Sequence, residues 1–291
     1  MKFVNFRHGG AVHYGAVDNG RIVDLTDALG DRYPDLIAFI QGGDEALVLA
    51  RRQVDAAGGA GLDYEQAELL SVVTDPGKIV CVGLNYHDHV AEASAALGGR
   101  EVPQQPMIFA RWKESLVPHR GAIQRPRVSH HLDWEAELLV VIGKTTGRYV
   151  TEANALDHVF GYSCFNDGSI RDYQFHTRQI GPGKNFEATG GNGPWLVTAD
   201  EIPDPQNLQV QMRLNGQVMQ DANTSNMVFT VAQIIAYVSQ WIPLQPGDLI
   251  ASGTMGGVGF SRKPPIFMQP TDRAEIMIEG IGTLVNTVRD E

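Results

Sequence analysis

The sequence has few cysteines and no long hydrophobic run, and each shortage excludes a class of protein. Cys81 and Cys164 are the only cysteines among 291 residues, so they form neither a disulfide framework nor a Cys-x-x-Cys motif for zinc or thiol exchange. No apolar stretch approaches the roughly 18 residues of a membrane-spanning helix, and the opening residues lack the apolar core of a signal peptide. We therefore expect a cytoplasmic protein.

Positive charge is also scarce. The chain has 23 Lys+Arg against 34 Asp+Glu, which leaves a formal net charge of −11. A nucleic acid or an anionic membrane would need a basic patch, so neither is expected as a partner. With 43% hydrophobic and 20% charged residues, the composition is that of an ordinary globular protein that buries a large core.

The first 75 residues predict a small N-terminal α/β domain. Short strand-like segments cover residues 2–6, 11–17 and 21–25, with Asn19-Gly20 as a hairpin turn. Helices are predicted over residues 34–40, opened by Pro34, and over 44–57, ended by Gly58-Gly59. Residues 58–77 are small and irregular, so we divide the chain into residues 1–75 and 76–291.

From Lys78 onwards the patterns favour strands. Apolar or alternating segments cover residues 78–84, 137–142, 208–214, 217–220, 273–279 and 283–288. Helices are predicted over residues 86–97 (up to Gly98-Gly99), 152–159 (behind Thr151) and 231–240 (behind Thr230). Strands and helices do not alternate regularly, which argues against a doubly wound sheet. The expected fold class is α+β, predominantly β.

Two glutamates at the start of an apolar strand are the strongest local feature. Glu135 and Glu137 are two residues apart, so a strand would project both to one face, and Asp133 could join them. Close carboxylates repel unless a cation lies between them, and Mg²⁺ or Mn²⁺ is the oxygen-seeking ion that fits. The alternative is an exposed acidic strand end, but the apolar run after Glu137 places the pair at the rim of a buried strand.

Further candidates for such a site lie in loops. Asp167, within Asn166-Asp167-Gly168, is either a third acid or part of an ordinary turn. Arg171, Asp172 and Gln174 follow it and make this stretch unusually polar. Three histidines, His119, His130 and His131, lie near the acidic strand in sequence. They are more simply interpreted as loop residues than as ligands.

A histidine and a glutamate form the second constellation. His89 and Glu92 are three residues apart on the helix predicted over 86–97 and are therefore neighbours. A carboxylate beside an imidazole fixes its tautomer and makes it a better general base, although a surface ion pair has the same spacing. His87 would point to another side of the helix.

Glycine-rich stretches supply two more candidates. Residues 252–259 (SGTMGGVG) match neither a P-loop nor a dinucleotide fingerprint, yet their backbone N–H groups could hold a carboxylate or an enolate. Lys184 lies in a loop between glycines and an aromatic residue, either solvated or facing an anion. Neither a Gly-x-Ser-x-Gly elbow nor a cysteine with a neighbouring histidine occurs, which argues against an acyl-enzyme.

Seven segments in a fixed order together resemble the fumarylacetoacetate hydrolase family. They are residues 78–92 (KIVCVGLNYHDHVAE), 133–144 (DWEAELLVVIGK), 161–172 (GYSCFNDGSIRD), 183–186 (GKNF), 193–198 (GPWLVT), 246–259 (PGDLIASGTMGGVG) and 279–286. The resemblance covers the chain from Lys78 to its C-terminus. Many members have a proline where this chain has Met255, which leaves the substrate open.

The resemblance implies a mixed β-roll or sandwich core, a homodimer, and one divalent metal ion, Mg²⁺ or Mn²⁺, in each subunit. Carried over by position, the metal ligands are Glu135, Glu137 and Asp167. The implied catalytic residues are His89 and Glu92, which activate water, and Lys184, which meets the substrate. The implied substrate-binding residues are Gln174, Thr254 and Arg111, the last as a partner for a substrate carboxylate.

The activity implied by the resemblance is cleavage of the C3–C4 bond of a 2,4-dioxo acid. Hydrolysis of such an acylpyruvate, for example fumarylpyruvate, would release pyruvate in the catabolism of aromatic or sugar acids. The alternative at the same metal site is oxaloacetate decarboxylation or tautomerisation, or a related isomerase or hydratase reaction. A non-catalytic protein holding a structural ion is a third possibility, but it would need neither the His–Glu pair nor the lysine.

Overall fold

The computed structural model describes residues 1–98 and 101–291, and its largest element is a twelve-stranded mixed sheet. The strand order is β4-β3-β2-β1-β14-β12-β11-β17-β6-β7, with β5 beside β1 and β8 beside β14. The strands are β1 (Lys2–His8), β2 (Ala11–Asp18), β3 (Arg21–Asp24), β4 (Leu62–Asp63), β5 (Glu68–Leu69), β6 (Ile79–Gly83), β7 (Met107–Ala110), β8 (Leu116–Pro118), β11 (Ala136–Ile142), β12 (Val159–Asp167), β14 (Gly190–Thr198) and β17 (Leu249–Thr254).

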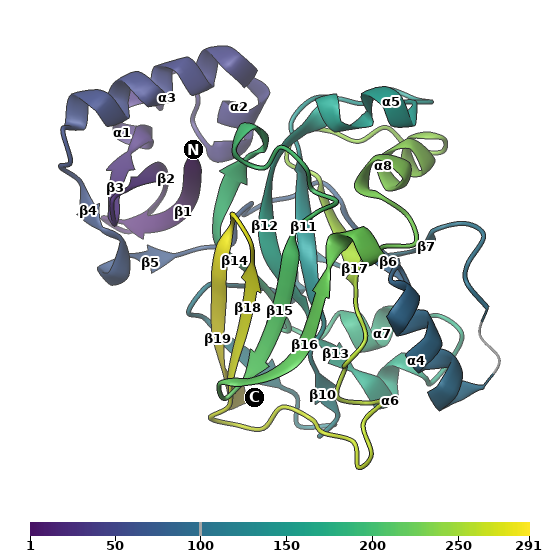
Figure 1. The fold of residues 1–291 in the computed structure, drawn as a ribbon. Helices are drawn as coiled ribbons and strands as arrows, with labels where there is room; N and C mark the ends of the chain where they lie inside the picture. Colours follow the sequence, from purple (N-terminus) through teal and green to yellow (C-terminus); the bar gives the residue numbers. More distant parts are fainter. Residues whose placement is uncertain (99–100) are drawn as a thin grey trace.

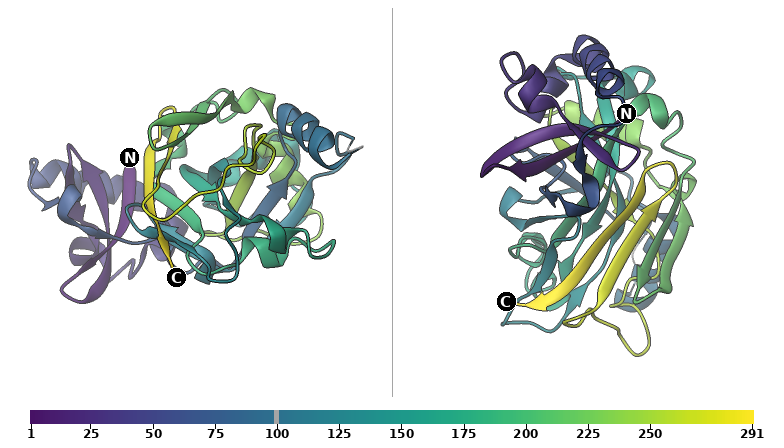
Figure 2. Two further views of the ribbon diagram at one scale, coloured as in Figure 1. Left: turned by 90° about the horizontal axis from the view of Figure 1, so that it is seen from below. Right: turned by 90° about the vertical axis from the view of Figure 1, so that its left-hand side faces the viewer.

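A five-stranded sheet packs against one face of the large sheet (Figure 2, right). Its strands, in spatial order, are β16 (Gln217–Asn223), β15 (Gln209–Leu214), β18 (Arg273–Ile278), β19 (Gly282–Asp290) and β9 (Ala122–Arg125). Leu138 and Val140 of β11 share one buried hydrophobic cluster with Met212, Ile276 and Leu284 of the smaller sheet. This arrangement confirms a predominantly β fold and a packed, sandwich-like core.

Eight α-helices surround the sheets in the described part of the chain (Figure 1). They are α1 (Leu25–Leu29), α2 (Leu36–Gln41), α3 (Gly43–Ala57), α4 (His87–Leu97), α5 (Glu152–Ala155), α6 (Arg171–Gln174), α7 (Gly181–Lys184) and α8 (Val231–Ser239). None of them is both long and apolar enough to cross a membrane. Helices α4, α6 and α7 gather near the two-stranded pair β10 (Leu132–Asp133) and β13 (Ser169–Ile170).

The N-terminal strands extend the large sheet. Lys2 and Phe3 of β1 pair with Val197 and Leu196 of β14, and the ring of Phe3 lies 5.9 Å from that of Phe160. The sheet and its core therefore continue across the boundary predicted between residues 75 and 76, and a separate N-terminal domain stays a prediction. In the view from below, these strands and helix α4 lie at opposite sides of the molecule (Figure 2, left).

Several helices and one hairpin begin or end where their capping and turn residues predicted. Helix α3 ends at Gly58, which adopts φ +55°, and α8 begins with the full capping box of Thr230 and Gln233. The β15–β16 hairpin turns at Asn215-Gly216, whose φ values are +52° and +81°. Helix α4 continues through Leu97 as predicted; of the expected stop at Gly98-Gly99, Gly99 lies outside the described residues.

Two helix predictions differ from the structure, and one helix was not predicted. Helix α1 was not predicted, because its five residues are too few for a periodic pattern; the side chain of Asp24 caps it. The helix expected from Pro34 begins at Leu36, because Asp35 accepts a hydrogen bond from Ala38 N at 2.7 Å and is the cap. The helix expected over 152–159 ends at Ala155, and strand β12 already starts at Val159.

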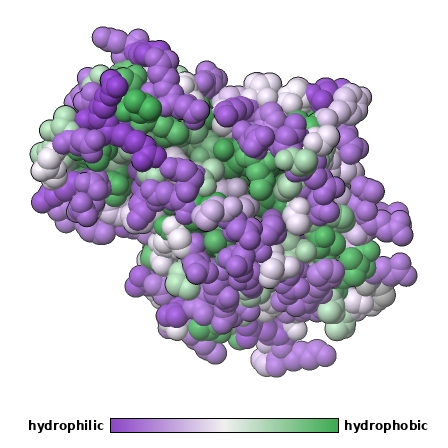
Figure 3. All heavy atoms as spheres, turned by 45° about the horizontal axis from the view of Figure 1, so that its top comes forward, coloured by the Kyte–Doolittle hydropathy of each residue, from purple (hydrophilic) through white to green (hydrophobic). Residues whose placement is uncertain are grey.

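Hydrophilic residues cover most of the face drawn in Figure 3, with smaller hydrophobic areas between them. Below the surface, all seven residues of β11 are buried. The chain therefore presents Glu137 from within a strand that has no solvent-facing side, which explains how a carboxylate comes to lie inside the molecule.

Candidate active site

Three predicted carboxylates meet inside the molecule. Glu135, Glu137 and Asp167 each offer an oxygen atom, and these atoms all lie within 4.8 Å of one another. Glu135 precedes β11, Glu137 is its second residue, and Asp167 ends the neighbouring strand β12. Asp167 is fully buried in a strand, so the interpretation of its segment as an ordinary turn is wrong.

Burial and mutual repulsion act most strongly on Glu137. Burial, together with the charges of Asp167 and Glu135, raises the pKa of Glu137 well above its usual range. Its Oε2 accepts one hydrogen bond, from Gly253 N at 2.9 Å. Burial would raise the pKa of Glu135 too, but the cations Lys184 and Arg171 lower it to about 2. The triad thus concentrates negative charge that calls for a further cation.

Lys184 lies among these carboxylates and not in solvent. Its Nζ is 2.7 Å from Glu135 Oε2 and 2.6 Å from Asp167 Oδ2, and the side chain is 2% exposed. Burial alone would lower the pKa of Lys184, but Asp167 and Glu135 outweigh it and raise the pKa above its usual value. Lys184 is therefore a fixed positive charge at the edge of the triad.

Arg111 does not reach the cavity, contrary to the expectation that it binds a substrate carboxylate. Its guanidinium donates to Asp167 Oδ1 at 2.5 Å, to the carbonyl of Gly168, to Thr189 Oγ1 at 2.8 Å and to Ser115 Oγ. The side chain is buried behind Asp167. Its donors are used within the protein, and Arg111 orients a triad carboxylate instead.

Asp133 is not a fourth ligand, although it lies close to the acidic strand in sequence. Its carboxylate accepts four hydrogen bonds, from Trp134 N, Gly259 N, Phe260 N and Arg171 Nε, at 2.8–2.9 Å. These donors satisfy the carboxylate without a metal ion. Asp133 therefore holds Arg171 and the glycine-rich segment in place.

Arg171 lines the cavity described below, and the sequence drew attention to its polar stretch without giving this residue a role. It begins helix α6, four residues after Asp167, within the stretch noted for its polarity. Its Nη1 donates to Glu135 Oε1 at 2.6 Å and to Gln174 Oε1 at 2.8 Å, whereas the buried Nη2 has no hydrogen-bond partner among the described residues. A buried cation with an unused donor suits an anionic ligand.

The predicted His–Glu pair forms on helix α4. His89 Nδ1 lies 3.2 Å from Glu92 Oε2, and both side chains are largely buried. The chain enters this helix through Leu84, which has φ +54°, an unusual conformation for a residue with a side chain. Asn85 stabilises the turn, since its Nδ2 donates to the carbonyls of Phe229 and Ser252. His87, on another side of α4, is exposed.

Three backbone N–H groups of the glycine-rich segment donate to carboxylates of the protein itself. Gly253 N donates to Glu137, Gly257 N donates to Glu92 Oε1 at 3.0 Å, and Gly259 N donates to Asp133. At Gly257, φ is +100° and a Cβ atom would lie 2.4 Å from the carbonyl of Met219, so this position requires glycine. The segment connects three carboxylates that belong to different elements.

A cavity of about 310 Å³ opens beside these groups. Polar residues at its wall are His89, Glu92, Glu135, Arg171, Gln174, Thr177, Arg178, Lys184, Thr254 and Ser261. Apolar residues at its wall are Val82, Leu84, Met107, Phe109, Phe175, Ile180, Val258 and Phe260, together with Gly83 and Ala93. The volume is at the lower end of small-molecule sites, about 300–1,000 Å³, which fits a small acid with an apolar or unsaturated part.

Gln174 and Thr254 line the cavity as predicted, but Met255 does not. The amide of Gln174 accepts from Arg171, which leaves its NH₂ group available. The hydroxyl of Thr254 donates to the carbonyl of Ala136 at 2.9 Å, so its proton is committed to the protein. Met255 is fully buried in the core, so the departure from proline at this position does not shape the cavity.

The remaining histidines stay outside the site. His130 and His131 are exposed, and His131 stacks on Phe267 at 4.6 Å. His119 Nδ1 accepts a hydrogen bond from Val285 N at 3.0 Å, and burial lowers its pKa to about 4. The interpretation of all three as loop histidines holds, with His119 as a structural one.

The residues present fit a divalent metal ion. Three buried carboxylates with oxygen atoms within 4.8 Å supply the hard ligands of Mg²⁺ or Mn²⁺. Burial, and after it the charges of Asp167 and Glu135, raise the pKa of Glu137, and a cation bound between the carboxylates would oppose that rise. Glu135, Glu137 and Asp167 are therefore the residues that would hold the ion, beside Lys184 and the cavity.

Comparison with known proteins identifies similar chains. The family described as fumarylacetoacetate (FAA) hydrolase C-terminal matches residues 78–289. The mitochondrial oxaloacetate tautomerase FAHD2A of Bos taurus is 37% identical over 99% of this chain and 91% of its own length. Similar sequences therefore include an enzyme of 2-oxo acid metabolism, aligned over almost the whole chain.

Solved structures with a similar fold cover the full chain as well. Fumarylacetoacetate hydrolase from Exiguobacterium antarcticum has a TM-score of 0.80 at 33% identity and is matched over 100% of both chains. Maleylpyruvate hydrolase from Sphingobium sp. SYK-6, in complex with manganese(II) ion and pyruvate, also has a TM-score of 0.80, at 29% identity over 100% of this chain and 99% of its own.

Proposed function

The chain belongs to the fumarylacetoacetate hydrolase family, and from that premise we propose that it is a divalent-metal-dependent hydrolase. The proposed reaction cleaves the C3–C4 bond of a 2,4-dioxo acid, an acylpyruvate such as fumarylpyruvate, and releases pyruvate. One observation carries the proposal: a carboxylate-bound imidazole, His89, lines the same cavity as Glu135 of the acidic triad and Lys184. A general base and an oxygen-ligand site therefore face one small space.

Glu135, Glu137 and Asp167 are the proposed ligands of Mg²⁺ or Mn²⁺. The chemistry that such an ion supplies when bound is polarisation of the C2 carbonyl of a 2-oxo acid. Arg111 and Lys184, which contact Asp167, and Arg171, which contacts Glu135, hold these carboxylates in position. The sulfur-free, oxygen-only donor set argues against zinc or copper as the physiological ion.

His89 is the proposed general base. The carboxylate of Glu92 accepts a hydrogen bond from the Nδ1–H group of His89, so the free lone pair is on Nε2, which can take a proton from water. The water oxygen attacks C4, the C3–C4 bond breaks, and its electron pair passes to the pyruvate part, which takes up a proton at C3. Water and an acylpyruvate thus give pyruvate and a carboxylic acid.

Lys184, Arg171 and Gln174 are the proposed partners of the substrate's negative charge. Lys184 stays charged beside the triad. In the described part of the chain, neither Nη2 of Arg171 nor the NH₂ group of Gln174 donates a hydrogen bond, and both side chains line the cavity. Preorganised donors of this kind contribute about 3–4 kcal/mol to transition-state stabilisation in comparable enzymes. Arg178, also at the wall, adds a further positive charge that suits a dicarboxylic substrate.

Oxaloacetate tautomerisation is the second candidate, because a relative with that activity aligns over 99% of the chain. The same His89 would move a proton between C3 and the C2 oxygen, with no attacking water. Decarboxylation of oxaloacetate would need the bound metal ion but not the general base. The cavity, at about 310 Å³, accommodates the small oxaloacetate as well as an acylpyruvate.

His89→Gln distinguishes these reactions. Its amide preserves a polar side chain but cannot act as a base, so we expect hydrolysis of fumarylpyruvate and tautomerisation of oxaloacetate to fall by about 100-fold or more, whereas decarboxylation continues. A coupled pyruvate assay and the ultraviolet absorbance of enol oxaloacetate follow the reactions separately. His87→Gln, on the exposed side of the same helix, is the control. Wild-type hydrolysis in His89→Gln would remove His89 as the base.

A homodimer and a cytoplasmic location remain part of the proposal. The resemblance predicts the dimer, and the composition predicts the location. Sedimentation of the purified chain tests the first, with a monomer at micromolar concentration as the contradicting result.

A further inference from the structure

The segment that follows β17 contacts the His89–Glu92 pair through the side chain of Ser261, which has no role in the reaction proposed above. Ser261 Oγ donates to Glu92 Oε1 in a short contact, and it also lies 3.0 Å from the carbonyl of Val258. Ser261 lines the cavity with His89 and Glu92. A hydroxyl at this position therefore touches the carboxylate on which the imidazole depends.

The two oxygen atoms of Glu92 have separate partners. Oε1 accepts from Ser261 Oγ and from Gly257 N at 3.0 Å, whereas Oε2 faces His89 Nδ1 at 3.2 Å. Two donors on one oxygen atom fix the carboxylate plane and direct the other oxygen at the imidazole. Because a carboxylate can only accept, His89 must carry its proton on Nδ1.

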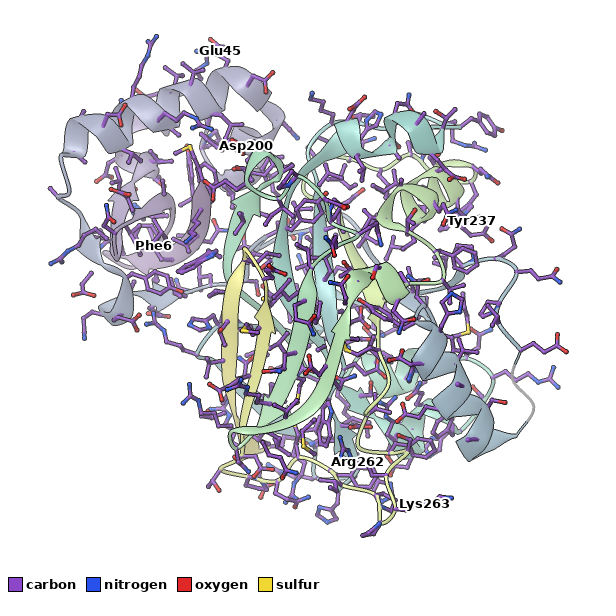
Figure 4. The ribbon with its side chains drawn as sticks, viewed as in Figure 1. Phe6, Glu45, Asp200, Tyr237, Arg262 and Lys263 are labelled. Carbon is purple, nitrogen blue, oxygen red and sulfur yellow. The ribbon has the colours of Figure 1, made fainter. Side chains whose placement is uncertain are left out.

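The segment that bears Ser261 is itself anchored. Arg262 Nη2 donates to the carbonyl of Met219 in β16 at 2.6 Å and to the carbonyl of Gly257 at 3.2 Å. Figure 4 shows Arg262 at the end of the molecule where this segment runs, with Lys263 beside it at the outer edge. Gly259 N and Phe260 N bind Asp133 at the same time. Ser261 therefore contacts Glu92 from a segment that is held in place independently of helix α4, which bears Glu92.

We propose that Ser261 is a positioning residue that acts through Glu92, a role that rests on the proposed function of His89 as a base. The hydroxyl has one proton and two acceptors, Glu92 and Val258. It donates to Glu92 Oε1, and the carbonyl of Val258 is its second possible acceptor. Gly257 N donates to the same oxygen of Glu92. Ser261 therefore holds the ionised carboxylate of Glu92 in the orientation that faces His89.

The pKa of Glu92 agrees with this arrangement. Burial alone would raise the pKa of Glu92, but the hydrogen bonds from His89, Ser261 and Gly257 lower it below its usual value. The carboxylate therefore stays ionised as the acceptor for the Nδ1 proton of His89.

Ser261→Ala and Ser261→Thr test the proposal together. We expect the alanine variant to lower kcat about tenfold, the effect of losing one hydrogen bond to a charged group, and to leave KM within about twofold. Threonine keeps the hydroxyl and should restore most of kcat. Binding of Mn²⁺, measured by calorimetry, should be unchanged in both variants. Lys263→Gln, in the same segment but at the molecular edge, is the control.

A second measurement does not depend on activity. Nitrogen NMR of ¹⁵N-histidine at about pH 8 should show His89 as the Nδ1–H tautomer in the wild type and as a mixture of tautomers in Ser261→Ala, with His89→Gln assigning the signal. An unchanged tautomer and an unchanged kcat in Ser261→Ala would overturn the proposal, and so would a loss that threonine fails to restore or that accompanies weaker Mn²⁺ binding. If the wild type acts on no 2-oxo acid, the proposed function fails, whereas the tautomer experiment still decides the role of Ser261.

Discussion

At the scale of single residues, the site is a balance of buried charges. Glu135, Asp167 and Asp133 form ion pairs with Lys184, Arg111 and Arg171, and all these side chains are almost fully buried. Removing one partner from such a network leaves the others uncompensated, which costs more than the lost contact alone. Individual substitutions should therefore separate residues that hold the metal ion from those that move protons.

Glu135→Gln tests the metal ligands. The amide lacks the negative charge that offsets Lys184 and the ion, so we expect the dissociation constant for Mn²⁺ to rise by more than the roughly 10–100-fold that loss of an outer partner causes. Calorimetric titration or the electron paramagnetic resonance of free Mn²⁺ measures it. Glu114→Gln, at an exposed position, is the matched control. Wild-type affinity in Glu135→Gln would exclude Glu135 from the ligand set.

His119 should make the fold sensitive to acid. Burial lowers its pKa to about 4 in the folded chain, against about 6.5 when unfolded, so the unfolded state binds the extra proton between these values. Its contribution to stability is complete above about pH 6.5 and is lost as the pH falls towards 4. By linkage, the loss at about pH 4.5 is roughly 2–3 kcal/mol.

The variant His119→Asn isolates this effect. Asparagine can accept the hydrogen bond of Val285 N without gaining a proton. Urea unfolding at about pH 7.5 and pH 4.5 should therefore show a smaller loss of stability in the variant than in the wild type, by about 2 kcal/mol. Equal losses in the two proteins would show that His119 is not the group responsible.

At the scale of elements, the glycine-rich segment of residues 252–259, which spans the end of β17, connects the carboxylate triad to the His89–Glu92 pair. It binds Glu137, Glu92 and Asp133, which come from β11, α4 and β10. Two adjacent glycines allow a matched test of this role. A Cβ atom at Gly257 would meet the carbonyl of Met219 at 2.4 Å, whereas at Gly256 the nearest atom is 3.5 Å away.

We expect Gly257→Ala to be harmful and Gly256→Ala to be tolerated. Alanine at Gly257 has both a steric conflict and a positive φ, a strain of about 1–3 kcal/mol, and it shifts the N–H that binds Glu92. The melting temperature and kcat should both fall in Gly257→Ala, and both should stay near the wild-type values in Gly256→Ala. Equal behaviour of the two variants would contradict the close packing described at Gly257.

Elements with a local signal were predictable from the sequence, and those that depend on distant pairing were not. Asn215-Gly216, Thr230 and Gly58 act on their own neighbours, so their turns and caps could be read directly. Strand β14, with the sequence GGNGPWLVT, resembles a loop by composition; β12, β1 and β8 make it a strand by pairing with it. Periodicity contains no information about such partners.

The same distinction applies to the candidate site. The spacing of Glu135 with Glu137 and of His89 with Glu92 predicted two pairs, which the structure contains. The position of Arg111 behind Asp167 depends on contacts with residues 56 to 78 positions away, which the sequence does not show. The family resemblance supplied Asp167 and Lys184 as members of the site, and residue types alone left both open.

At the scale of the whole molecule, an ion bound by three strand-linked carboxylates should stabilise the fold. Glu137 lies in β11 and Asp167 in β12, both central strands of the large sheet, so the ion would join the core of the molecule. A ligand at 1,000 times its dissociation constant adds about 4 kcal/mol to the free energy of unfolding. We expect Mn²⁺ at that excess to raise the melting temperature by about 5–10 °C and EDTA to reverse the rise.

Glu135→Gln is the control for that shift, since it removes a ligand and should abolish most of the effect of Mn²⁺. A melting temperature that responds equally to Mn²⁺ in both proteins would place the ion elsewhere.

The family match at residues 78–289 leaves the N-terminal strands outside it, and these strands lie across the molecule from α4, so the reaction should depend on the larger part of the chain.

Under the proposed function, this chain needs a divalent ion to release pyruvate from an acylpyruvate. The most direct test follows pyruvate formation from fumarylpyruvate with lactate dehydrogenase, first with Mn²⁺, then after EDTA, and then after Mn²⁺ is restored. We predict pyruvate release with the ion, at least about 100-fold less after chelation, and full recovery. Pyruvate formation that EDTA leaves unchanged, or none at all in the presence of Mn²⁺, would contradict the account.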